Sequence, residues 1–184
     1  SVASGGLSLS ENYLYTTQAF RAYYDHLTDD GVLVIMRWHA DTPRLVSNSV
    51  AFLGTAEASK RVVVLTEKHG NGEDPPQMMF MLRKRPFTEE ETARMMAWPL
   101  ADPVIVPGRH AEPPYDALFS GRKTMDQIAA EAPRRIEAVF DDSPFFFATE
   151  KPWGIPKRMQ EALGALVAPL FGLLAIAVIF GRPR

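Results

Sequence analysis

Residues 10–38, SENYLYTTQAFRAYYDHLTDDGVLVIMRW, contain the pattern that decides the fold. The Ser10 hydroxyl can cap a helix whose apolar face recurs at helical spacing. That face consists of Phe20, Tyr23, Tyr24 and Leu27. Turn-forming residues 28–31 end in a glycine, and the apolar run VLVIM follows without alternation. An unalternating run directly after a helix predicts a central strand of a parallel sheet, buried on both faces.

The next segments continue an α/β pattern. Residues 42–58 have a loose apolar face and a proline at the second position, which predicts a helix. The apolar runs at 61–66 and 77–82 are separated by the turn-rich HGNGEDPP, which predicts a hairpin. The expected fold is therefore the C-terminal half of a Rossmann-like doubly wound sheet that ends in an antiparallel hairpin. Because no strands precede residue 10, we expect the chain to be a fragment of a longer polypeptide.

Residues 87–150 change to short, proline-separated pieces, with helices expected at 88–98 and 124–132 and a brief strand at 104–106. The acidic run at 89–91 follows Thr88 in a capping box and favours a helix N-terminus over a carboxylate site. Thr124 with Gln127 predicts a second capping box. Three regions are expected. They are the sheet domain at 1–86, an accessory connector at 87–150, and a juxtamembrane segment with a terminal helix at 151–184.

The terminal region predicts a transmembrane helix. Residues 162–180 are nineteen in a row without a charge, and basic residues flank them on both sides. A span needs about 20 predominantly apolar residues. The alternative is a buried core helix. The aromatic residues at 145–147 fit either a membrane interface or packing against the folded domain.

Composition excludes several classes of function. The net charge is −2 with basic and acidic residues dispersed, so nucleic acid is not an expected partner. Without cysteine there is no disulfide, thiolate nucleophile or Cys-ligated zinc. The four histidines lack an i, i+4 pair, and the adjacent Asp141 and Asp142 lack the spacing of a calcium loop, so no metal site is expected.

Residues 5–85 resemble the C-terminal half of the spermidine synthase family and related class I S-adenosylmethionine-dependent methyltransferases. The resemblance lies in a small-residue loop, ENYLYT at 11–16, and DGVL at 30–33. Arg37-Trp38 and DDSPFFF at 141–147 resemble bacterial membrane proteins that carry such a domain. The resemblance implies aminopropyl or methyl transfer from S-adenosylmethionine or its decarboxylated form to a small-molecule acceptor. It also implies a bacterial inner-membrane location with the soluble part in the cytoplasm.

The catalytic and cofactor-binding residues of that family precede the matched segment, so none is assigned in this chain. The family's polyamine-binding enzymes carry a glutamine shortly after the strand, whereas this chain has Met36-Arg37-Trp38. The acceptor is therefore not identified, and a homo-oligomer remains an open alternative.

Ligands of doubly wound sheets bind outside the carboxyl ends of the strands, which selects a set of candidate substrate-binding residues. The candidates are Glu11, Tyr13, Arg37, Trp38 and His39. Glu11 is better explained as a first-turn acid that complements the helix dipole. For Arg37 and Trp38, ordinary packing at a strand end is an equal alternative. His39 lies where a general base would be useful.

Two hypotheses about function follow. In the first, the chain is part of a membrane-tethered spermidine synthase-like transferase. In the second, the domain has lost catalysis and serves as a regulatory or interaction module of a transporter-like membrane protein. The replacement of the family's glutamine by Met36-Arg37-Trp38 favours the regulatory or interaction module.

Overall fold

The structure is a computed structural model that describes residues 12–68, 76–151 and 157–180. It divides into two compact units. The first comprises Ser1–Ala132 and Ile136–Phe147, and the second comprises Pro133–Arg135 and Ala148–Arg184. Each unit is described by itself.

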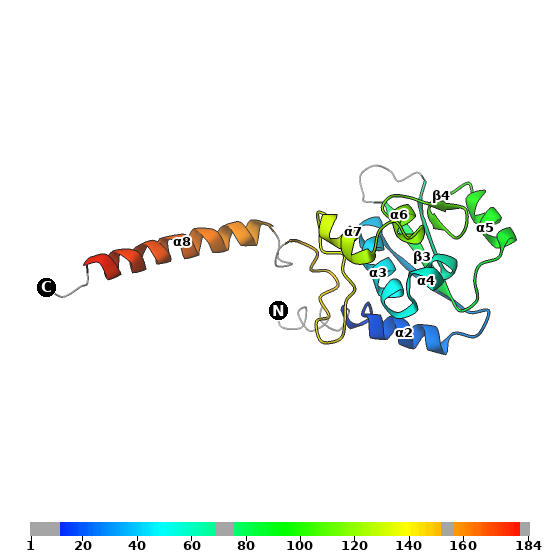
Figure 1. Ribbon diagram of the computed structural model, residues 1–184, viewed down its shortest axis with the longest axis horizontal. Coiled ribbons are helices and arrows are strands. Elements are labelled where there is room, and N and C mark those ends of the chain that lie inside the picture. Colours follow the sequence, from blue (N-terminus) through cyan, green and yellow to red (C-terminus); the bar gives the residue numbers. More distant parts are fainter. Residues whose placement is uncertain (1–11, 69–75, 152–156, 181–184) are drawn as a thin grey trace. The chain divides into compact units, whose positions relative to one another are not determined.

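The first unit contains helices and strands (Figure 1). Its helical elements are α2 (Thr17–His26), the 3-10 turn η1 (His39–Asp41), α3 (Thr42–Leu53), α4 (Thr55–Arg61), α5 (Glu89–Met96), α6 (Tyr115–Phe119) and α7 (Met125–Glu131). Its strands are β1 (Val32–Trp38), β2 (Val62–Glu67), β3 (Gln77–Arg83), β4 (Ala101–Val106) and β5 (His110–Ala111).

The five strands form one sheet in the order β1-β3-β2-β4-β5, and every neighbouring pair is antiparallel. The predicted hairpin is confirmed, since β2 pairs with β3. The predicted Rossmann-like parallel sheet is wrong. The physical reason is the position of β3. This second strand of the hairpin lies between β2 and β1 and is antiparallel to both, so no two strands of like direction are neighbours.

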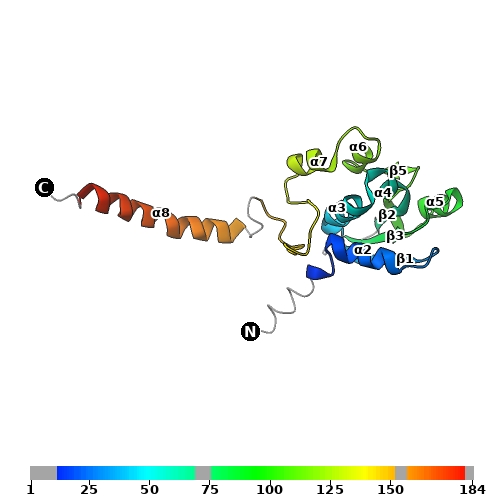
Figure 2. The same ribbon diagram turned by 60° about the horizontal axis from the view of Figure 1, so that its bottom comes forward.

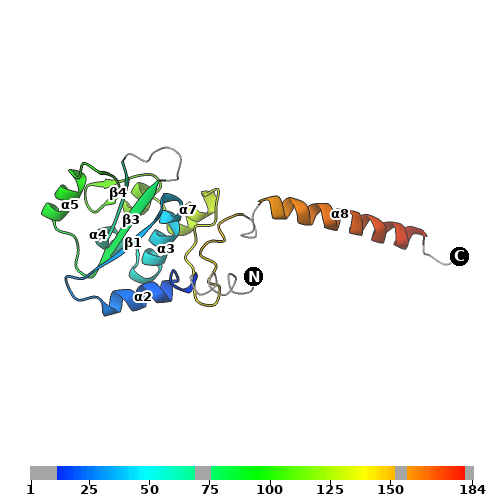
Figure 3. The same ribbon diagram turned by 180° about the vertical axis from the view of Figure 1, so that it is seen from behind.

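Strand β1 is an edge strand, and the prediction that it is central and buried on both faces is wrong. Figure 3 shows it beside β3, its only neighbour in the described sheet. Alternate side chains are exposed, with Met36 at 61% and Trp38 at 42% of full exposure. The strand is apolar on both sides, but only one side is covered. One apolar face and one hydrogen-bonding edge of β1 are therefore open.

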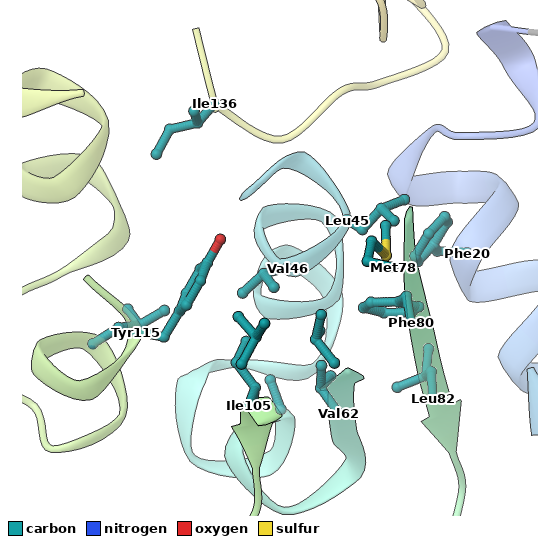
Figure 4. Packing of buried hydrophobic residues seen from close by; sticks show 14 of the residues in the cluster. Phe20, Leu45, Val46, Val62, Met78, Phe80, Leu82, Ile105, Tyr115 and Ile136 are labelled. Atoms are coloured by element: carbon teal, nitrogen blue, oxygen red, sulfur yellow. The ribbon is translucent and has the colours of Figure 1, made fainter. Parts of the chain in front are cut away.

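The main core lies on the covered face, beneath α2 and α3 (Figure 4). Phe20 of α2 packs against Phe80 of β3 with ring centroids 5.9 Å apart. Leu45 and Val46 of α3 belong to the same fully buried cluster. A smaller cluster on the opposite face joins strands β2 to β4 with Met95 of α5 (Figure 2 gives a second view of α5). Helix α5 thus lies over the part of that face away from β1.

Helix boundaries differ from the sequence-based expectation at two places. Ser10 lies outside the described residues, and Thr16 is the N-cap of α2, where its hydroxyl accepts a hydrogen bond from the Ala19 N–H at 3.1 Å. The single helix expected at 42–58 is two helices, because Gly54 takes φ +78° between α3 and α4. A side chain at that backbone angle is strained, so the break requires glycine.

The second unit contains helix α8 (Lys157–Phe180). Within the described ranges, no helix is long and apolar enough to cross a membrane, so the predicted C-terminal transmembrane helix is wrong. Three charged residues occupy the first turns of α8, and a proline and glycines interrupt the apolar remainder.

Both capping boxes predicted from the sequence are confirmed, at Thr88 with Glu91 and at Thr124 with Gln127. Glu91 has a second role. Its carboxylate also accepts a hydrogen bond from Arg83, a residue that is 5% exposed, at 2.8 Å. Hydrogen bonds from the Thr88 backbone N–H and the Arg83 guanidinium lower the pKa of Glu91 from 4.5 to about 2.

We expect Glu91→Gln to lower the free energy of unfolding at pH 7 by about 1–3 kcal/mol, because it leaves the buried Arg83 charge poorly paired. The folded pKa of Glu91 lies below its unfolded value, so its contribution is complete above about pH 4.5 and is lost toward about pH 2. Urea unfolding from pH 7 to pH 2.5 measures this. The difference in free energy of unfolding between wild type and Glu91→Gln should become smaller as the pH falls. The exposed Glu90→Gln should show no such difference at any pH. A difference in free energy of unfolding that does not change with pH would contradict a stabilising role of the ionised Glu91 carboxylate.

Candidate functional site

A cluster of charged and aromatic side chains lies at the C-terminal end of β1. The Arg37 guanidinium carbon is 5.3 Å from the ring centroid of Tyr15 and 4.8 Å from that of Phe147. Its Nε donates a hydrogen bond to Asp41 Oδ2 at 3.1 Å. Tyr15, Phe147 and Asp41 therefore form a cage around a cation, and we call these three residues the β1 cage.

Strand geometry brings Arg37 into this position. Side chains alternate along β1, so Arg37 shares the covered face with Leu33 and Ile35, while Trp38 lies on the open face. Asp41 follows four residues later, in the turn η1 between β1 and α3. The side chains of Arg37 and Asp41 are only 22% and 15% exposed, so their ion pair is partly shielded from water.

The two rings of the β1 cage come from segments that are far apart in the sequence. Tyr15 precedes α2, and its ring stacks on the buried Phe146 at 4.7 Å. Phe147 is anchored by its backbone N–H, which donates to Asn12 Oδ1 at 3.3 Å. The Tyr15 carbonyl accepts a hydrogen bond from Asn48 Nδ2 at 2.7 Å. Both rings also contact the buried Phe146, so each has a contact besides the cation.

Two buried polar atoms beside the β1 cage have no hydrogen-bond partner among the described residues. They are His39 Nδ1 and Thr42 Oγ1, at the two ends of the turn η1. Thr42 is 1% exposed. An unsatisfied buried polar atom costs about 1–3 kcal/mol, and such atoms are concentrated at sites where structure is held for function.

The structure brings only some of the candidate residues predicted from the sequence together. Arg37 and His39 lie at the same strand end, but Trp38 faces the opposite side of the sheet. Tyr13 is half exposed. Glu11 and the loop 4–10 lie outside the described residues. The described residues contain no group of three or more His, Asp or Glu side chains that could hold a metal ion.

Sequence reasoning missed all three residues of the β1 cage. Asp41 could have been found from its i, i+4 spacing to Arg37. Tyr15 is part of the ENYLYT run and had no distinguishing signal. The sequence marks Phe147 only as part of the aromatic run at 145–147. Only the folded chain brings its ring near that of Tyr15, at 5.8 Å between ring centroids.

No protein-family model, curated protein or solved structure matches this chain. The function of the site is therefore argued from its chemistry.

Proposed function

We propose that this chain supplies the acceptor-binding wall of a spermidine synthase-like transferase, and that the acceptor is an organic amine. The observation that supports this is the β1 cage. Two aromatic ring faces and one carboxylate surround a cation at the end of a strand, and protonated amines are recognised by this combination of groups.

Arg37 fills the β1 cage when no acceptor is bound. Its guanidinium contacts the same two rings and the same carboxylate that an ammonium group would use. An incoming amine therefore competes with the Arg37 side chain, and Arg37 acts as a gate. Because the rings are anchored independently, the cage keeps its shape when Arg37 leaves.

The residues described here do not by themselves fit S-adenosylmethionine, which the family resemblance implies. An adenosine needs hydrogen-bonding groups for its ribose and base. At this strand end Arg37 and Asp41 are paired with each other, and His39 Nδ1 and Thr42 Oγ1 are buried. We therefore assign no cofactor contact to this chain and derive no transfer step.

Calorimetric titration with spermidine tests the proposal. We expect weak binding to the wild-type chain and about tenfold tighter binding to Arg37→Ala, since a cation in such a cage is worth about 0.5–2 kcal/mol. Adding Asp41→Asn to Arg37→Ala should abolish the gain. Arg122→Ala, which removes an exposed arginine elsewhere, is the control. Equal affinities of wild type and Arg37→Ala would contradict the gate.

We also expect the 184-residue chain alone to transfer neither an aminopropyl nor a methyl group, because the residues that the structure describes at the end of β1 offer no fitted site for the donor. An assay with labelled S-adenosylmethionine and its decarboxylated form, each with spermidine as the acceptor, measures this. Turnover above the rate without protein would overturn this expectation.

A second candidate is a non-catalytic interaction module, and the open face of β1 favours it. A shallow cavity of about 240 Å³ lies on that face, lined by Met36, Met79 and Trp98 among others. Exposed apolar surface of this kind often marks a protein contact. The spermidine titration distinguishes the two candidate functions. A non-catalytic interaction module is not expected to bind spermidine in a way that depends on Asp41.

A further inference from the structure

A cavity lies away from the β1 cage, lined by residues of α4, α5, α6 and the turn between β4 and β5. Figure 1 labels the three helices. The volume of the cavity is about 630 Å³, within the range of pockets that hold small organic ligands. Its apolar lining includes Phe87, Ile105 and Phe119. Its polar lining includes Thr92, Arg109 and His110.

Arg109 is held in place by neutral groups. Its Nε donates to Thr92 Oγ1 at 2.9 Å, and its Nη2 donates to the Glu89 carbonyl at 2.9 Å. Thr92 is 3% exposed, and its own hydroxyl donates to the same carbonyl. No carboxylate in the described ranges forms an ion pair with Arg109. The guanidinium is therefore oriented in advance, with its charge not neutralised by a neighbour.

The other charges around the cavity are largely paired. Lys60 binds Glu57 at 3.0 Å, and Asp116 binds Arg122 at 2.5 Å. Glu89 also lines the cavity, and its carboxylate is exposed. Arg109 is thus the cation best placed to bind a ligand, and Glu89 is the group that opposes an anion.

We propose that this cavity binds a small organic anion that carries a carboxylate on an aromatic or other apolar body. The carboxylate lies against the Arg109 guanidinium, whose planar fork matches two oxygens. The apolar body lies against the phenyl rings that line the cavity. The site is independent of the β1 cage, so it neither requires nor tests the proposed amine acceptor.

Phenylacetate and its uncharged isostere phenylacetamide test the proposal by calorimetric titration of the full chain. We expect phenylacetate to bind at least about tenfold more tightly than the amide, a difference of 1.4 kcal/mol. Arg109→Gln should remove that preference, and Glu89→Gln should strengthen phenylacetate binding. Arg21→Gln, on an exposed arginine of α2 that does not line the cavity, should change neither.

Phenyl phosphate is a second probe, which distinguishes a carboxylate site from a general anion site. Binding of phenyl phosphate more tightly than phenylacetate would overturn the assignment to carboxylates. Equal binding of phenylacetate and phenylacetamide would overturn the proposal as a whole. If Arg109→Gln fails to fold, Glu89→Gln still decides, since unchanged or weaker phenylacetate binding would contradict an anion site.

Discussion

Replacing Phe146 by alanine should lower the free energy of unfolding by about 3–5 kcal/mol, the usual cost of removing a buried phenylalanine. Phe146 is fully buried although it lies in an irregular segment. Its ring stacks on Tyr15 at 4.7 Å and meets Phe147 edge-on at 5.2 Å. The substitution therefore opens a cavity in the core and removes the support of both rings of the β1 cage. Urea unfolding followed by circular dichroism measures the loss.

Phe145→Ala is the matched control, because the neighbouring Phe145 is 53% exposed. It should cost less than about 1 kcal/mol, as exposed substitutions usually do. If the two variants were equally stable, Phe146 would not be a core residue, and the residues at 145–147 would have to be reassigned to another contact.

Replacing Asn48 by alanine should lower the free energy of unfolding by about 2–4 kcal/mol, since each buried group left unpaired costs about 1–3 kcal/mol. Asn48 is fully buried on α3 and joins three segments. Its Nδ2 donates to the Tyr15 carbonyl at 2.7 Å, and its Oδ1 accepts from the Val139 N–H at 2.8 Å. The Thr17 hydroxyl is 3.3 Å from the same oxygen. Thermal unfolding, combined with urea titration, measures the loss.

Ser49→Ala is the control for a buried polar residue on the same helix. The Ser49 hydroxyl donates only to the Leu45 carbonyl of α3 itself, so its removal should have a small effect. Asn48→Asp retains the acceptor for the Val139 N–H but places a buried carboxylate oxygen against the Tyr15 carbonyl, so at pH 7 it should destabilise at least as much as Asn48→Ala. A stability of Asn48→Ala that equals that of Ser49→Ala would show that Asn48 does not connect these segments.

Local features of the fold could be predicted from the sequence because their causes are local. The Thr88 and Thr124 capping boxes need only four consecutive residues, and both are confirmed. The hairpin of β2 and β3 needs two apolar runs and a turn, and it is also confirmed.

The order of strands in the sheet could not be predicted in this way. The apolar run of β1 indicates a strand that is apolar on both sides, but it contains no information on which strand lies beside it. The insertion of β3 next to β1 depends on pairing between residues about 50 positions apart, such as Val34 with Met81. The prediction of a parallel sheet is wrong because an unalternating apolar run also fits an antiparallel edge strand with one open apolar face.

In the candidate site, too, residues with a local sequence signal could be predicted and residues placed by long-range packing could not. Arg37 could be selected because the end of a strand is a usual place for ligand contacts. Phe147 could not, since it reaches Arg37 only after its segment has packed on α3, where Arg44 donates to the Phe145 carbonyl at 2.5 Å.

The β1 cage is tested most directly by the NMR signals of arginine Nε–H groups and aromatic rings during titration with spermidine at constant ionic strength. The account predicts that the signals of Arg37, Tyr15 and Phe147 move together and saturate, while that of Arg109 stays unchanged. Signals of Arg37 and both rings that do not move at saturating spermidine, or shifts spread evenly over all arginines, would contradict an amine site at the end of β1.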